Sequence, residues 1–278
     1  MAKLFQNGFE EGNLSAWTSQ FLTNGAVNVQ STTKRTGAYA LQSHTDPTLN
    51  LARAQVSKSI ALQSEAYARA YVYISEGPES MGTHDRFYFV RLLASDNATA
   101  VMGGLRREGT QPLRWVMWYR RGASGNGSHT YGSIVEPASV MNRWICIELH
   151  YNQSTGLQEL YVDGVLQISV DPSKDSLILP SQLPTILSLE AGVYKSGATG
   201  QTYDPTTAYN ITVFVDDCII AQEYIGSDTP IQPKLTVTSS PELNVPVYVD
   251  NQFLGNTPIV IELPSGTHTV RVEEEVTR

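Results

Sequence analysis

The chain has 278 residues, of which 41% are hydrophobic and 17% are charged, so it can form one large and one small folded domain. Its net charge is −8 at pH 7. Because proteins that bind the phosphate backbone need a basic surface, this charge argues against a nucleic-acid partner. No apolar run approaches the roughly 20 residues of a membrane span, and no export signal is evident, so we expect no membrane association.

Alternation of polar and apolar residues with a period of two recurs along the first 228 residues, whereas long helical patterns are absent. Residues 66–74 are the clearest example, because Tyr67, Arg69, Tyr71 and Tyr73 should share one face of a strand and the small apolar residues the other. Further strands are expected at 86–93, 114–120, 143–151, 157–163, 186–195 and 211–221. The pattern predicts an all-β protein.

Two features interrupt this pattern. The glycine-rich segment 122–132 is expected to be a long connecting loop. Cys146 and Cys218 each lie in an apolar run and are expected to be buried thiols, although a disulfide between them stays open as an alternative.

The C-terminal part of the chain is expected to fold separately. Residues 229–233 contain two prolines and predict an extended linker. Beyond them, residues 234–278 contain short apolar segments separated by turn residues, which predict a small β-sandwich-like domain. The expected organisation is therefore a large domain at 1–228, a linker at 229–233 and a small domain at 234–278.

The large domain resembles the concanavalin A-like and laminin-G families. The resemblance is carried by a tryptophan strand with a following Tyr-Val-Asp-Gly turn and by the two ends of the domain, at residues 144–149, 160–164, 7–12, 36–41 and 214–220. It implies a two-sheet antiparallel jelly-roll sandwich in which the first and last strands pair. Such pairing closes the sheet and brings its two ends together.

Related carbohydrate-active domains often hold a structural calcium ion beside these paired ends. By similarity, its ligands here would be the carboxylates of Glu10 and Asp217 and the backbone carbonyl of Gly37. The alternative is that these acids only cap turns at the surface.

The small domain resembles the PEGA family. The matching motifs are found at residues 235–241, 247–250, 254–258 and 263–272. The resemblance implies a surface-displayed binding or spacer module without chemistry of its own. Because the family's last strand is missing, we expect a neighbouring subunit to cover the open edge, and hence a homo-oligomer.

The sequence lacks the motifs of the enzymes built on this fold. Glycosidases of the fold carry a Glu-x-Asp-x-Glu triplet on one strand, and no such triplet occurs. Residues 191–195 resemble one strand motif of alginate-type lyases, and Glu148 and His150 share a strand face, but the companion motifs are missing. We therefore expect a protein that is not an enzyme, with a polysaccharide lyase as the least favoured alternative.

A sugar-binding face is compatible with the aromatic strands. Aromatic rings stack on the C–H faces of sugars, and arginine pairs with carboxylates on acidic glycans. The candidate contact residues are Tyr67, Arg69, Tyr71, Tyr73, Trp118, Glu148, His150 and Tyr194. The alternative is that this aromatic stripe is half-buried packing.

The two ends of the large domain indicate a class of protein and a location. Residues 1–10 and 215–226 resemble bacteriophage virion proteins that carry this sandwich. The resemblance implies a structural or adhesive protein of the virion surface, a capsid-decoration or tail protein, whose partners are capsid or tail proteins and surface polysaccharide. The alternative is a secreted or cell-surface carbohydrate-binding module, which would be extracellular.

Overall fold

The computed structural model describes residues 3–46, 51–77, 86–107, 110–123, 126–196, 210–227, 234–237, 244–250, 252–262 and 269–272. The chain divides into two compact units, Met1–Ser227 and Asp228–Arg278, and each is described by itself. The expected linker at 229–233 lies outside the described residues. No helix in the described part is long and apolar enough to cross a lipid bilayer.

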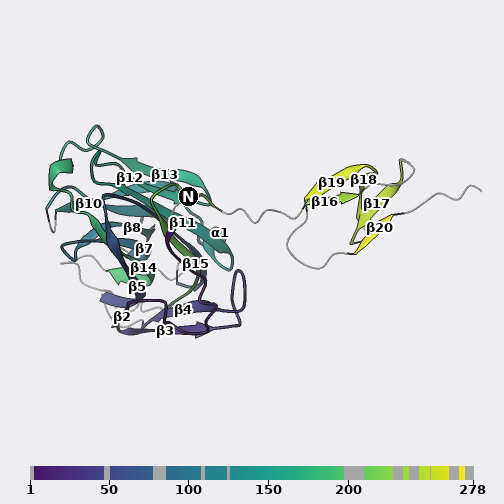
Figure 1. Ribbon diagram of the computed structural model, residues 1–278, viewed down its shortest axis with the longest axis horizontal. Coiled ribbons are helices and arrows are strands. Elements are labelled where there is room, and N and C mark those ends of the chain that lie inside the picture. Colours follow the sequence, from purple (N-terminus) through teal and green to yellow (C-terminus); the bar gives the residue numbers. More distant parts are fainter. Residues whose placement is uncertain are drawn as a thin grey trace, which may run out of the picture. The chain divides into compact units, whose positions relative to one another are not determined.

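The first unit contains two antiparallel sheets (Figure 1). Sheet A has the spatial order β13 (Val165–Val170), β12 (Gln158–Val162), β11 (Trp144–Asn152), β6 (Glu65–Glu76), β15 (Ile211–Ala221), β4 (Ala40–Thr45) and β3 (Gly25–Gln30), with β1 (Lys3–Asn7) also paired to β15. Sheet B has the order β10 (Gly127–Ile134), β9 (Arg114–Arg120), β8 (Thr99–Arg106), β7 (Arg86–Ala94), β14 (Ile186–Ser196), β5 (Leu51–Gln63) and β2 (Ser19–Thr23). The helical elements are α1 (Pro137–Val140) and a 3₁₀ turn at Pro180–Gln182. The prediction of an all-β, two-sheet sandwich is confirmed.

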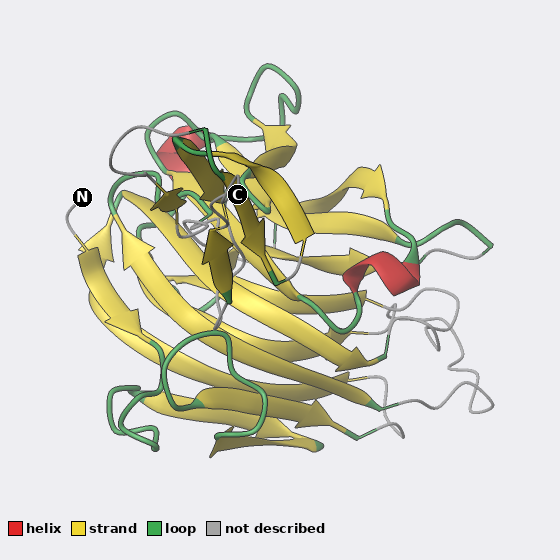
Figure 2. Ribbon diagram, turned by 90° about the vertical axis from the view of Figure 1, so that its right-hand side faces the viewer, coloured by secondary structure: helices red, strands yellow, loops and turns green. Residues whose placement is uncertain are grey.

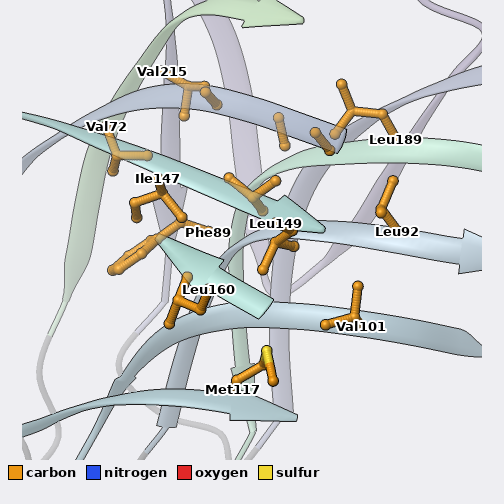
Figure 3. Packing of buried hydrophobic residues seen from close by; sticks show 14 of the residues in the cluster. Val72, Phe89, Leu92, Val101, Met117, Ile147, Leu149, Leu160, Leu189 and Val215 are labelled. Atoms are coloured by element: carbon orange, nitrogen blue, oxygen red, sulfur yellow. The ribbon is translucent and has the colours of Figure 1, made fainter. Parts of the chain in front are cut away.

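The core lies between the two sheets, whose curved strands stack in Figure 2. Alternation along β6 places its small apolar side chains, among them Ala68, Ala70 and Val72, in this core with no exposed surface. Figure 3 shows Leu149 and Leu160 of sheet A beside Val101 and other side chains of sheet B. Each such buried leucine or valine contributes roughly 1.5–3 kcal/mol relative to an exposed one.

The first and last strands of this unit lie side by side, as the resemblance implies. In the antiparallel pair of β1 with β15, Gln6 is opposite Ile219 and Asn7 is opposite Cys218. The Asn7 side-chain oxygen then accepts hydrogen bonds from the Phe9 backbone N–H and the Trp17 indole, both at 3.0 Å. The entry of the chain is thus fixed to its last strand by backbone pairing and by buried side chains.

Cys146 and Cys218 are both free thiols and both buried. Burial raises the pKa of the Cys146 thiol to about 12, so this thiol stays protonated at neutral pH. The expectation of two buried thiols is confirmed, and they form no disulfide.

The expected loop at 122–132 is partly a strand. Gly127–Ile134 forms β10 at the edge of sheet B, with His129 opposite Trp118. Glycine is required at 127 for packing, because a methyl group there would lie 2.1 Å from the Trp118 ring. The prediction was wrong because the glycines were interpreted as a sign of a loop. Gly127 instead lies in a strand, where the absence of a side chain makes room for the Trp118 ring.

The second unit contains two small sheets. β16 (Lys234–Val237) pairs with β19 (Ile259–Glu262), and β17 (Pro246–Val249) lies between β18 (Gln252–Asn256) and β20 (Val270–Val272). Val247 and Val249 are buried. A domain of about 50 residues buries a smaller share of its surface than a large one does.

Candidate functional site

The predicted sugar-contact residues lie on two different faces of the sandwich. Six of them belong to β6 and β11 and lie on the outer face of sheet A, whereas Trp118 and Tyr194 belong to β9 and β14 of sheet B. The eight residues therefore do not form a single sugar-binding surface. Whether either face contacts a sugar stays a prediction.

The outer face of sheet A is covered by the segment that follows β15, residues 222–227. The Glu148 carboxylate accepts hydrogen bonds from the backbone N–H groups of Ile225 and Gly226, at 2.8 and 2.9 Å. Arg69 donates to the Gly226 carbonyl at 2.6 Å. Arg69 and Glu148 are each only 1% exposed, so both charged groups contact this segment and not the solvent.

Aromatic residues extend the same contact. Tyr224 of the covering segment packs on Tyr161 and Tyr67, with ring centroids 5.1 and 6.1 Å apart. Tyr67 in turn stacks on His150 at 4.0 Å, and His150 lies 2.9 Å from both Glu65 and Glu159. Tyr67, Arg69, Glu148 and His150 thus contact other parts of the chain itself.

The two remaining tyrosines on this face also have protein neighbours. The Arg35 guanidinium lies 3.5 Å from the centre of the Tyr71 ring, an attractive cation–π contact. Tyr73 packs against Trp144 and Phe214 at 5.6 and 6.0 Å. The aromatic stripe of this face is therefore packed against other parts of the protein, which is the alternative that the sequence left open.

The outer face of sheet B has its own small apolar cluster. Tyr88, Met102 and Val116 are buried there, and Trp118 and Tyr194 pack against them while remaining partly exposed. Strand alternation produces this second cluster, because the neighbouring residues of the same strands point into the core. An aromatic surface thus lies in the middle of the sheet.

Charged groups surround the aromatic cluster. Glu190 of β14 is fully buried, and its Oε2 atom lies 2.7 Å from Arg53 and 3.1 Å from Arg91. Arg53 also donates to the Gln55 side-chain oxygen at 2.8 Å. One carboxylate therefore faces two guanidinium groups.

The two sheets differ in charge. The strands of sheet A contain two basic and six acidic residues: Lys3 and Arg69, and Glu65, Glu76, Glu148, Glu159, Asp216 and Asp217. The strands of sheet B contain one acidic residue, Glu190, and eight basic ones: Arg53, Lys58, Arg86, Arg91, Arg106, Arg114, Arg120 and Lys195. Positive charge is thus concentrated in sheet B of a chain that is acidic as a whole.

Several buried polar atoms on the sheet B face have no hydrogen-bond partner among the described residues. They include Gln55 Nε2, Glu190 Oε1 and the Nε atoms of Arg86 and Arg91. More than about 90% of buried polar groups in proteins are paired, so several such atoms on one face need an explanation.

The electrostatics of this face follow from burial and from clustered arginines. Burial, with Arg86 and Arg106 nearby, lowers the pKa of His129 to about 3. Arg86 lies 3.0 Å from His129 Nε2, and since arginine only donates, Nε2 is the acceptor of the neutral ring. Burial also lowers the pKa of Arg91, and the Arg53 charge acts in the same direction against the effect of Glu190.

A pocket of about 160 Å³ lies at the β8–β9–β10 end of the same sheet. Its lining residues are Arg106, Gln111, Pro112, Arg114 and Tyr131. The Arg106 guanidinium lies 5.2 Å from the centre of the Tyr131 ring. The sequence analysis did not single out these arginines, although Arg106 and Arg114 lie opposite each other on the consecutive strands β8 and β9.

The predicted calcium ligands are brought together at the junction of the first and last strands. A methyl group placed on Gly8 would lie 3.3 Å from Asp216 Oδ1, 3.5 Å from Asp217 Oδ1 and 3.6 Å from Glu10 Oε1. Gly37 lies against Glu10, because a methyl group on it would be 2.2 Å from Glu10 Oε1. Three carboxylates therefore surround Gly8, and Asp216 is a member that the sequence analysis missed.

These acids already have partners within the protein. Asp217 pairs with Arg35 at 2.5 Å, Asp216 accepts the Arg35 backbone N–H at 2.9 Å, and Glu10 accepts that of Ala38 at 2.7 Å. In the described part of the chain, no group of three or more His, Cys, Asp or Glu side chains is arranged to hold a metal ion as it stands. The donors nevertheless fit calcium in kind, since Ca²⁺ prefers carboxylate and carbonyl oxygens.

Comparison with known proteins confirms the fold and the nature of the small domain. Residues 232–276 match the family model of the PEGA domain. Among solved structures, the cellulose induced protein Cip1 is similar, with 16% identity and a TM-score of 0.54 over 80% of this chain and 99% of that one. An alginate lyase from Klebsiella pneumoniae is 11% identical, with a TM-score of 0.47 over 73% of this chain and 86% of that one. No curated protein matches the sequence, and at 16% identity the likeness to Cip1 establishes the jelly-roll fold alone.

Proposed function

We propose that this protein is a non-catalytic glycan-binding protein and that the outer face of sheet B contacts the sugar. The supporting observation is the pair of partly exposed aromatic rings, Trp118 and Tyr194, on this face, with the guanidinium groups of Arg53 and Arg91 near the Tyr194 ring. Binding sites for polar ligands combine apolar surface with a few convergent polar groups in this way. On the corresponding face of sheet A, Arg69 and Glu148 are instead hydrogen-bonded to Ile225 and Gly226 of the covering segment.

The residues of this face favour binding over hydrolysis. Glycoside hydrolysis needs two carboxyl groups flanking the bond, and the strands of sheet B supply only Glu190. That carboxylate is engaged by Arg53 and Arg91. The proposal therefore assigns recognition and not bond cleavage to this surface.

A calcium ion at the Gly8 site is proposed as a separate, structural feature. Glu10, Asp216 and Asp217 would hold it with backbone carbonyls, that of Gly37 included. When bound, the ion supplies positive charge that joins the chain entry to the last strand. The residues themselves already connect these segments through Arg35 and the amides of Thr36 and Ala38.

The virion surface remains the proposed setting, with capsid or tail proteins as partners and a homo-oligomer as the assembly. It rests on the sequence resemblance of residues 1–10 and 215–226. A surface-displayed PEGA module and a glycan-binding sandwich in one chain would suit an adhesive protein there. They would equally suit an extracellular carbohydrate-binding protein.

The glycan-binding proposal is tested with a matched pair of tryptophan variants on a glycan array. Trp118→Ala removes a partly exposed ring from the sheet B face, and Trp144→Ala removes a partly exposed ring from sheet A. We expect Trp118→Ala to weaken binding about tenfold, as loss of an aromatic contact residue usually does, and Trp144→Ala to leave it unchanged. Loss of binding with Trp144→Ala alone would refute the choice of face. Release of unsaturated sugars that absorb ultraviolet light would refute the non-catalytic assignment.

A further inference from the structure

We infer that the glycan bound by the outer face of sheet B is anionic, with carboxylate or sulfate groups on its sugars. This inference rests on the proposed function and names its ligand class. It is carried by the charge of the face and by the geometry around Glu190.

Around Glu190, the described residues place one carboxylate against two guanidinium groups. Its Oε2 atom accepts from both Arg53 and Arg91, so one negative charge is shared between two positive ones. Partly buried cations are stabilised by nearby negative charge, so an anionic ligand beside Arg53 and Arg91 would be favoured over a neutral one.

The same pairing fixes the positions of the two guanidinium groups. Glu190 binds both arginines through Oε2, and the Gln55 side-chain oxygen accepts from Arg53. Glu190 and Gln55 are fully buried, whereas the side chains of Arg53 and Arg91 are 19% and 11% exposed. The charged groups that a ligand can reach here are therefore the two guanidinium groups, which match an acidic group on a sugar.

Both cations lie near the same aromatic ring. The guanidinium carbons of Arg53 and Arg91 are 6.0 and 5.6 Å from the centre of the Tyr194 ring. Arg53 is also held over the Phe21 ring at 4.0 Å. A sugar stacked on Tyr194 would therefore have a guanidinium group within reach of a substituent on its ring, and arginine binds carboxylate and sulfate oxygens through two parallel hydrogen bonds.

The test compares charged and neutral polymers that share a backbone. Affinity electrophoresis of the full chain uses polygalacturonate and its carboxyl-reduced form, dextran sulfate and dextran, and single-stranded DNA as an unrelated polyanion. Arg53→Gln is compared with Arg143→Gln, which removes the same charge from an exposed ion pair with Asp163. Gln55→Met, which keeps the charge of the face, is the second variant in case Arg53→Gln does not fold, as judged by circular dichroism.

We expect a charged polymer to bind at least tenfold more tightly than its neutral counterpart. The polygalacturonate and dextran sulfate arms show whether the carboxylate or the sulfate is recognised. Because a hydrogen bond to a charged group is lost, Arg53→Gln should weaken binding about tenfold or more, Gln55→Met several-fold, and Arg143→Gln not at all.

The contrary outcomes are distinct. Equal binding of charged and neutral polymers overturns the anionic ligand and leaves the proposed function standing. Equal losses in Arg53→Gln and Arg143→Gln, or equal binding of DNA, overturn it as well, because either reports only the overall charge. Binding to none of the four glycans overturns the inference and the proposed function together.

Discussion

The outer faces of the two sheets bury charged groups in different surroundings. On sheet A, Glu148 and Arg69 are buried under residues 222–227, and their hydrogen bonds hold that segment in place. On sheet B, Glu190 is equally buried, but it binds two arginines whose side chains stay partly exposed beside the Tyr194 ring. Burial of charge alone therefore does not identify a binding face; the exposure of the groups paired with the buried charge separates the two faces.

The largest expected effect is on the stability of the sheet A face. Glu148→Ala removes a buried carboxylate that faces Arg69 and two backbone amides. We expect a loss of about 3–5 kcal/mol in the free energy of unfolding, because the nearby Arg69 charge loses its compensating carboxylate and the Ile225 and Gly226 amides lose their acceptor. Urea denaturation measures it, and glycan binding by the folded fraction should not change.

The control for this variant is an exposed ion pair. Arg143 and Asp163 are 46% and 42% exposed, and Arg143→Ala should cost no more than about 1 kcal/mol. Equal losses in Glu148→Ala and Arg143→Ala would mean that the covering segment contributes little to stability.

Calcium should affect stability and not binding, since its proposed ligands lie beside β15 of sheet A. With calcium at a hundredfold excess over its dissociation constant, the first unit should gain about 2.7 kcal/mol, and a chelator should lower Tm correspondingly. Asp217→Asn should abolish the dependence without backbone strain, because Asp217 has φ of 47° and asparagine tolerates this conformation. Asp163→Asn is the control, and an unchanged Tm with chelator would contradict the calcium proposal.

A smaller effect on stability is expected from His129 of the sheet B face when the pH is lowered. The folded-state pKa of His129 is about 3, below its ordinary value of 6.5, so the unfolded chain takes up a proton that the folded protein resists. The stabilising contribution is therefore complete above about pH 6.5 and is lost as pH falls toward about 3. His129→Gln should show a smaller decrease of the urea midpoint between pH 7 and pH 4 than the unchanged chain. Identical pH profiles would contradict the lowered pKa of His129 in the folded protein.

Much of the fold could be predicted from the sequence. The alternation in residues 66–74 indicated a strand with a small-residue core face, and the motifs at the two ends indicated that the first and last strands pair. Both features are local or depend on a recurring motif. The Tyr224-Ile225-Gly226 end of the large domain was predicted only as a resemblance, and its contacts with Glu148 and Arg69 give it a physical role.

The candidate site could not be predicted in the same way. Alternation shows which residues of one strand share a face, but not which sheet the strand joins, so Tyr67 and Trp118 were grouped together. Arg53, Arg91 and Glu190 come from three strands that are distant in sequence, and only the order β7–β14–β5 brings them together. The absence of acidic residues from successive strands was a signal that could have suggested this face.

The covering of sheet A by residues 222–227 has a mechanical consequence. The chain continues from Ser227 into the second unit, so tension applied from that side reaches the sandwich first through Gly226. Its carbonyl and amide are held by Arg69 and Glu148, which belong to β6 and β11 in the interior of the sheet. A pulling force is thereby distributed over two internal strands before β15 is loaded, which would suit a protein that holds on to its target under shear.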